Sequence, residues 1–149
     1  ESQFDEAADE YRSADRLLES FHSLVSDSVG FTSKSTTRGR EFVSKENLAS
    51  LRSLLLAVNL NLAACHLKAA LQHQEPASLP DMAAARRAAA RCSAALMVDP
   101  ASVKARFRRA QAMSILGDFD SSVRDLQAAA ATEPNNVEIQ RELALAKRR

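Results

Sequence analysis

The chain has 149 residues, of which 20 are basic and 19 acidic, with a net charge of +1 and 5% aromatic residues. This balance argues against a general nucleic-acid or membrane-surface binder, and neither a signal peptide nor an uninterrupted apolar run long enough to cross a bilayer is apparent. Alanine is abundant, while Gly is 3, Pro 4 and Trp 0, which predicts an all-helical protein. Cys65 and Cys92 lie in apolar helical contexts, and we expect buried free thiols in a reducing, cytoplasmic compartment.

A sequence period organises the chain. Pro100 and Pro134 are 34 residues apart, and small or apolar residues precede both at the same offsets. The matching pairs are Ala95 with Ala129, Cys92 with Leu126, and Ala88 with Ser122. This is the pattern of the tetratricopeptide repeat, a helix pair that buries its apolar faces only by stacking on a neighbour.

In chain order, residues 4–20 show a similar spacing of small and aromatic residues. They are predicted to be the second helix of a first repeat, whose first helix would precede residue 1. Residues 21–43 are rich in Ser, Thr and Gly and predict a long connection. Residues 44–100 form the second repeat, with a long amphipathic helix from about Ser44 to Ala70 and a partner helix ending near Val98. The apolar stripe of the long helix recurs mainly at three- and four-residue steps and consists of Leu48, Leu51, Leu55, Val58, Leu62, Cys65 and Leu67. About ten residues, 70–80, are inserted in the turn between these helices.

Residues 101–134 form a regular third repeat. Gly117 is predicted to end its first helix, and Asp118 to cap its second. Residues 135–149 predict a polar C-terminal capping helix. The expected fold is one all-α domain, a right-handed superhelix of antiparallel helix pairs. Five alanines are expected at close helix contacts: Ala63, Ala88, Ala95, Ala110 and Ala129.

Two cations mark the first helix of the third repeat. Lys104 and Arg108 are four residues apart and therefore lie on one helix face. Such a pair is either screened by solvent or forms a fork for a carboxylate. Arg106 and Arg109 lie off this line, and we interpret them as solvent-facing or structural.

The segments LNLAACHLK, VKARFRRAQA, GDFDSSVRDLQ and PNNVEIQRELALAKRR resemble the tetratricopeptide domain of large immunophilins, the FK506-binding type first and the cyclophilin type second. The resemblance implies a co-chaperone that binds the C-terminal Glu-Glu-Val-Asp tail of the ninety-kilodalton heat-shock chaperones, or of the seventy-kilodalton class. Asn61, Lys104 and Arg108 match three of the five residues of its two-carboxylate clamp. The other clamp residues, a Lys and an Asn, belong to the first helix that is absent here. The resemblance also implies a peptidyl-prolyl isomerase domain before this chain in the full-length protein.

The chemistry of these residues fits the clamp. Asn61 can donate its amide to a carboxylate, Lys104 supplies a point charge, and Arg108 a planar fork. First helices of successive repeats line one groove, so the three side chains should share a surface. The alternative is a structural tetratricopeptide interaction domain in which these residues are solvated and no clamp functions. A weaker third possibility is an isomerase whose repeat domain has lost its ligand.

No catalytic constellation, cofactor motif or metal-ligand spacing is apparent, so the chain itself is not expected to be an enzyme. His22, His66 and His73 do not match metal-ligand spacing with each other or with the cysteines. The expected partner is a chaperone tail rather than nucleic acid or membrane. Because the helix at 4–18 lacks a neighbour, we expect it either to recruit a second copy, as a homodimer or a domain swap through the 23–43 connection, or to fray.

Overall fold

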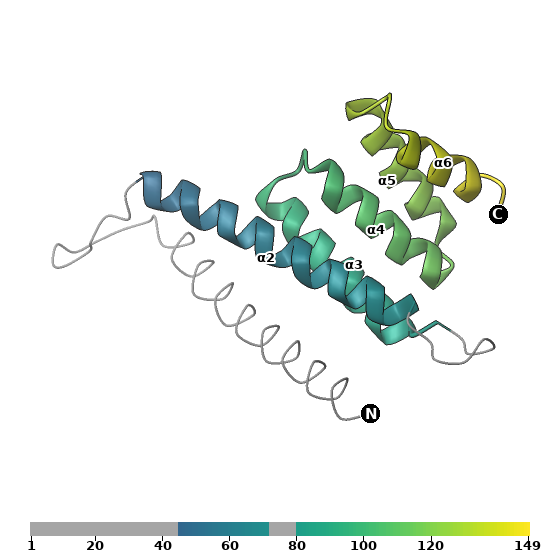
Figure 1. Cartoon of the computed structure of the whole chain (residues 1–149), viewed down its shortest axis with the longest axis horizontal. Coiled ribbons are helices and arrows are strands. Elements are labelled where there is room, and N and C mark those ends of the chain that lie inside the picture. The colour runs from purple at the N-terminus through teal and green to yellow at the C-terminus, as the bar shows by residue number, and fades with distance from the viewer. Residues whose placement is uncertain (1–44, 72–79) are drawn as a thin grey trace, which may run out of the picture. The chain divides into compact units, whose positions relative to one another are not determined.

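The computed structural model of the chain describes residues 45–71 and 80–149. Over these two ranges the chain folds into five α-helices and contains no strand, which confirms the all-α prediction. The helices are α2 (Lys45–Leu71), α3 (Met82–Val98), α4 (Val103–Leu116), α5 (Phe119–Thr132) and α6 (Val137–Ala146) (Figure 1). The predicted helix at 4–20 and the connection at 21–43, with the domain swap that depends on them, lie outside the described residues.

The helices pack in chain order, each against the next. Contacts join α2 to α3, α3 to α4, α4 to α5 and α5 to α6, and α2 also touches α4 directly. Together they form one compact unit, Lys45–Arg149. Consecutive helix pairs are what a tetratricopeptide-type fold predicts, because each pair covers the apolar face of the next. The assignment of individual helices to numbered repeats stays a prediction.

The turn between α4 and α5 forms as its residues predict. Gly117 has a φ of 82°, in the left-handed region that glycine enters without a steric penalty, and it ends α4. The Asp118 side chain then accepts a hydrogen bond of 3.0 Å from the backbone N–H of Ser121 and caps α5. Three other described helices begin at side-chain caps of the same kind, at Asp81, Ser102 and Asn136.

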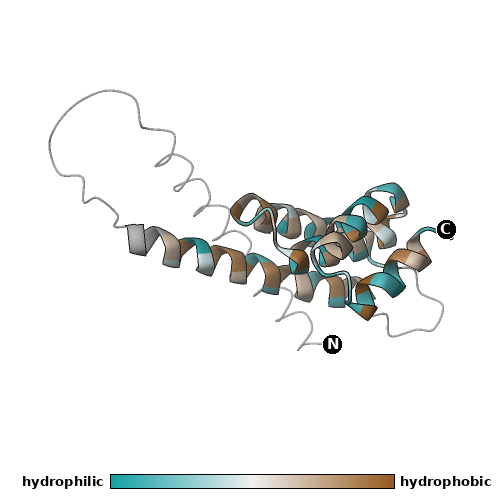
Figure 2. Ribbon diagram, turned by 90° about the horizontal axis from the view of Figure 1, so that it is seen from above, coloured by the Kyte–Doolittle hydropathy of each residue, from teal (hydrophilic) through white to brown (hydrophobic). Residues whose placement is uncertain are grey.

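Alanine lets these helices approach closely. Ala63, Ala88, Ala95, Ala110 and Ala129 are all fully buried, at most 1% exposed, which confirms their predicted place at helix contacts. In the C-terminal core, Ala110 of α4 and Ala129 of α5 pack with Ile139 of α6. Toward α2, Ala95 and Ala105 pack with Leu60. In Figure 2 apolar and polar residues alternate along the helices, as amphipathic packing requires.

The buried face of α2 differs from the predicted stripe. Asn59 and His66 are buried, whereas Val58 and Cys65, which belonged to the predicted stripe, are only half-buried. Both α3 and α4 pack against α2, so its buried surface is broader than a single stripe and includes these two polar positions. The Asn59 amide is partly satisfied there, because its Nδ2 donates to the Leu55 carbonyl at 2.9 Å.

Helix α2 is also unusually apolar. By length and composition alone, its segment Ala49–Leu71 could cross a membrane, with a mean hydropathy of 1.6, and 44% of the most apolar window is buried in the structure. This corrects the expectation based on uninterrupted apolar runs, which overlooked the helix as a whole. A core helix of a soluble protein meets the same criterion, and α2 packs along α3 and against α4.

Candidate functional site

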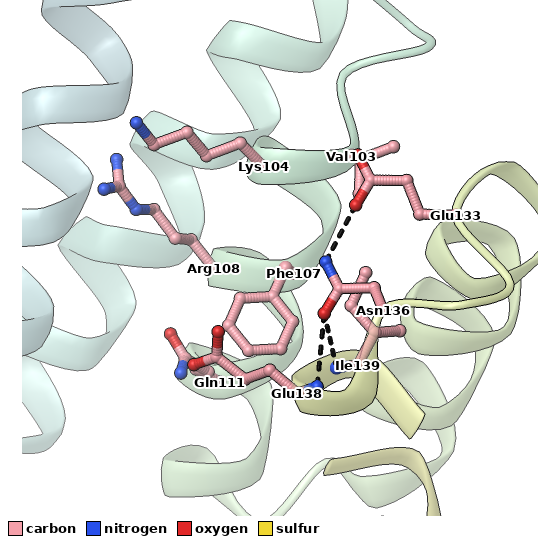
Figure 3. Close-up of a pocket in the computed structure, with 9 residues that line it drawn as sticks. All are labelled: Val103, Lys104, Phe107, Arg108, Gln111, Glu133, Asn136, Glu138 and Ile139. Carbon is pink, nitrogen blue, oxygen red and sulfur yellow. Dashed lines mark hydrogen bonds between the residues drawn. The ribbon is translucent and has the colours of Figure 1, made fainter. Parts of the chain in front are cut away.

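The α4 helix presents the candidate cations on a single face. Lys104, Phe107, Arg108 and Gln111 recur at steps of three and four residues, which brings them into line on an α-helix. Lys104 is exposed and Arg108 half-buried. Figure 3 shows the Lys104 ammonium and the Arg108 guanidinium pointing to the same side, next to each other. The structure therefore brings this predicted pair together.

Arg108 is held by the neighbouring helix rather than standing free. Its NH1 group donates a hydrogen bond of 2.6 Å to the backbone carbonyl of Leu60, in the middle of α2. The next residue along α2 is Asn61, whose side chain is exposed. This bond uses one of the five N–H donors of the guanidinium, which leaves the remainder of the fork for another acceptor.

A cavity of about 410 Å³ opens between α4 and the start of α6. Its lining combines apolar side chains in the floor with cations on α4 and carboxylates beyond (Figure 3). The lining residues are Val103, Lys104, Phe107, Arg108, Gln111, Glu133, Asn136, Glu138 and Ile139. Asn61 is not among them, so the structure places it on the adjacent α2 surface rather than in the cavity.

The wall opposite the cations is acidic and is held by the cap of α6. The Oε2 atom of Glu133 accepts a hydrogen bond of 2.8 Å from the Nδ2 of Asn136. The Oδ1 of Asn136 accepts in turn from the backbone N–H groups of Glu138 and Ile139, at 3.2 and 3.3 Å. These contacts hold the backbone at the start of α6, which carries Glu138. The acidic wall is therefore part of the capped first turn of this helix.

Sequence reasoning missed this wall and the role of the residues between it and the cations. The sequence patterns do not single out Phe107, Gln111, Glu133 or Glu138 as residues of a site. The available signal was the short turn after α5: Pro134 and the Asn136 cap place the first turn of α6 directly after Glu133. Because the connection is so short, α6 must pack against the pair formed by α4 and α5. Its first turn then carries the Glu138 carboxylate to the cavity.

Arg109, the neighbour of the candidate cation, is structural. Its guanidinium forms a two-pronged contact with Asp125 of α5, Nε to Oδ2 at 2.6 Å and NH2 to Oδ1 at 2.7 Å. The hydrogen bond to Asp125 raises the pKa of Arg109. Arg106 donates to the Pro100 carbonyl at 2.8 Å. The two-pronged contact occupies the fork of Arg109, in agreement with the structural interpretation, whereas Arg106 uses one donor on the Pro100 carbonyl.

The two cysteines are free thiols in different surroundings. Cys92 is fully buried, and this burial raises the pKa of its thiol to about 12, although the nearby Arg108 and Arg109 cations act in the opposite direction. Cys65 is only half-buried, so the expectation of burial is confirmed for Cys92 alone. Among the described residues, no group of three or more His, Cys, Asp or Glu side chains could hold a metal ion.

Over the described residues the chain is thus a domain of consecutively packed helix pairs with a cation-lined cavity. No protein-family profile matches the chain. It is 32% identical to mouse (Mus musculus) Peptidyl-prolyl cis-trans isomerase FKBP4 over 106 residues, which cover 71% of this chain and 20% of that protein. It is 46% identical to Protein unc-45 homolog B of Xenopus tropicalis over 50 residues, 34% of this chain and 5% of that protein. The mouse Protein unc-45 homolog B is 34% identical over 92 residues, 62% of this chain and 8% of that protein.

The chain thus spans at most 20% of the length of these curated relatives. At this level the similarities support a tetratricopeptide-like helical domain of the chaperone-associated type. FKBP4 supports the immunophilin resemblance, and unc-45 homolog B does not. The sequence identities do not favour FKBP4 over unc-45 homolog B.

Proposed function

We propose that this chain is a protein–protein interaction module that binds the acidic C-terminal tail, of Glu-Glu-Val-Asp type, of a heat-shock chaperone. The observation that carries the proposal is the hydrogen bond from Arg108 to the Leu60 carbonyl. It fixes the guanidinium beside Lys104 and next to the α2 turn that carries Asn61. A terminal Asp offers a main-chain and a side-chain carboxylate, and charge-assisted hydrogen bonds to such groups contribute about 1.5–3 kcal/mol each.

The partial similarity to FKBP4 and unc-45 homolog B supports the same class of function. We also propose that the chain is the C-terminal part of a peptidyl-prolyl isomerase co-chaperone of the cytoplasm, with the isomerase activity outside this chain. Within the described residues the structure is a set of packed helices with an open cavity, a form suited to binding an extended peptide.

The test is calorimetric titration of the complete domain, which includes the first helix expected to precede residue 1, with the peptide Met-Glu-Glu-Val-Asp, beside its C-terminally amidated form. We expect the free acid to bind with a Kd on the order of micromolar and the amide to bind more weakly, because it lacks one carboxylate. Equal binding of both forms, or binding of neither, would contradict the proposal. The matched protein control is Lys68→Ala, which removes an exposed cation of α2 outside the cavity.

A second function is favoured by one specific observation. Glu133 and Glu138 line the same cavity as the cations and disfavour a highly acidic ligand. The chain would then be a structural interaction domain without a working clamp, which contacts other proteins through its helix faces. Loss of binding in the calorimetric experiment, together with an unchanged fold, is the outcome that would favour this alternative.

A further inference from the structure

The charge of the cavity changes sign from one wall to the other. Lys104 and Arg108 lie on α4, and Glu133 and Glu138 lie on the side formed by the start of α6. Between them the floor is apolar, with Phe107 packed against the core cluster that contains Ile139. In Figure 3 the Glu138 carboxylate extends toward Gln111. A ligand that fits both walls must itself carry charges of opposite sign.

The spacing along α4 indicates which ligand residue meets the acidic wall. From the midpoint of Lys104 and Arg108 to Gln111 the helix axis rises about 7.5 Å, at 1.5 Å per residue. An extended peptide covers about 3.3–3.6 Å per residue. If the acidic C-terminal residue is bound by the cations and the peptide runs along α4 toward Gln111, the residue before it lies between Phe107 and Gln111. The side chain two residues before the end then reaches Gln111 and Glu138.

We propose that Glu138 makes this site selective for peptides that carry a basic side chain two residues before an acidic C-terminal residue. The proposal rests on the proposed function, because it requires the acidic end to lie on Lys104 and Arg108. It adds a preference that the cations alone do not produce: a carboxylate at that position is repelled by the acidic wall, and a lysine is attracted.

Glu138 also has a structural role, which the experiment must separate from selectivity. It is an acidic residue in the first turn of α6, where a negative charge stabilises the helix N-terminus. Replacing it therefore lowers stability whether or not it contacts a ligand. The ratio of two peptide affinities on one protein preparation is unaffected by such a loss, because the fraction of folded protein cancels.

The experiment measures fluorescence anisotropy of three labelled peptides, Met-Glu-Glu-Val-Asp, Met-Glu-Gln-Val-Asp and Met-Glu-Lys-Val-Asp, with the full 149-residue chain at low salt. We expect the lysine peptide to bind roughly two- to fivefold more tightly than the glutamate peptide, with the glutamine peptide between them. Glu138→Gln should remove most of this preference, and Glu138→Lys should reverse it. Glu142→Gln is the matched control, since Glu142 follows one turn later on α6 and does not line the cavity.

The outcomes separate the two proposals. If Lys104→Ala weakens all three peptides but the unmodified chain binds them equally, the selectivity is wrong and the proposed function stands. A preference that survives Glu138→Gln, or that Glu142→Gln changes as much, also overturns the selectivity, because the general surface charge would then explain it. If no peptide binds, or Lys104→Ala changes nothing, the proposed function fails and the selectivity fails with it.

Discussion

Arg109 and Asp125 join α4 to α5 through two hydrogen bonds, of 2.6 and 2.7 Å, between a guanidinium and a carboxylate. The Asp125 side chain is 8% exposed and the Arg109 side chain 26%. A third bond, from Arg109 to the Ser93 hydroxyl at 3.3 Å, extends the contact to α3. One side chain thus connects three consecutive helices, directly beside the arginine that faces the cavity. Arg109 therefore stabilises the packing of the helices, whereas Arg108 lines the cavity.

Breaking the Arg109–Asp125 pair should destabilise the fold without changing the cavity. We expect Asp125→Ala to lower the free energy of unfolding by about 2–3 kcal/mol, because a partly buried guanidinium loses its partner. Urea unfolding followed by circular dichroism measures this. In an Arg109→Ala background the same replacement should cost clearly less, since no charge is then left unpaired. An equal loss in the free energy of unfolding in both backgrounds would show that Arg109 and Asp125 do not stabilise each other.

The two cavity cations should differ in what their replacement does. Lys104→Ala is expected to weaken binding of the acidic peptide by about 1–3 kcal/mol with little change in stability, because its side chain is exposed. Arg108→Ala should weaken binding similarly and also lower the melting temperature, because the bond to Leu60 is lost. Arg108→Lys should not restore full affinity, since the planar fork is absent.

Calorimetry and thermal melts on the same preparations check this pair of expectations. Added salt should weaken binding to the unmodified chain, because the site is open to solvent. Unchanged binding in the Lys104→Ala, Arg108→Ala double variant would show that the cations are not the peptide site.

Overpacking at Ala110 should be costly. Ala110 is 1% exposed and lies in the core shared by α4, α5 and α6. We expect Ala110→Leu to lower the free energy of unfolding by about 1–3 kcal/mol, since the added atoms must push helices apart. Ala131→Leu, on the exposed face of α5, is the control and should change stability by less than about 0.5 kcal/mol. Equal effects at both positions would contradict the close helix contact.

The buried thiol of Cys92 should make stability depend on alkaline pH. Its pKa is raised by burial from 9.0 to about 12 in the folded chain. Below pH 9 the thiol is protonated in both states, so its contribution is constant. Above pH 9 the unfolded chain releases the proton while the folded chain retains it, and stability is lost by about 1.4 kcal/mol per pH unit.

The measurement is urea unfolding of the unmodified chain and of Cys92→Ala across this alkaline range. The variant should show a shallower decline, and the difference between the two slopes isolates the thiol from other titrating groups. Parallel slopes for Cys92→Ala and the unmodified chain would contradict the raised pKa.

Local chemistry made much of this fold predictable. Gly117 and Asp118 determine where α4 ends and α5 begins, because a left-handed residue and a carboxylate cap act within one turn of their own positions. The buried alanines were predictable from the 34-residue period, since stacked repeats place small residues at equivalent contacts. Both signals are short-range or periodic, which is why a single sequence contains them.

What escaped prediction depends on neighbours distant in sequence. The bond from Arg108 to Leu60 joins residues 48 positions apart and involves a backbone carbonyl, which has no side-chain signature. The burial of Asn59 follows from the packing of two other helices, α3 and α4, against α2. The acidic wall of Glu133 and Glu138 exists only when α6 stacks beside α4. The cation pair was therefore predictable, while the shape and charge of its surroundings were not.

The contact between Arg108 and the Leu60 carbonyl limits which residues of the cavity can change in evolution. Arg108 both lines the cavity and joins α4 to α2. A substitution that alters its contact with a ligand therefore also weakens the packing between these two helices. Lys104, exposed and unconstrained by any comparable contact in the described chain, can vary at little cost to the fold. Related domains with new ligand preferences should therefore differ first at the position of Lys104 and along the start of α6. The arginine would be the last of these residues to be exchanged.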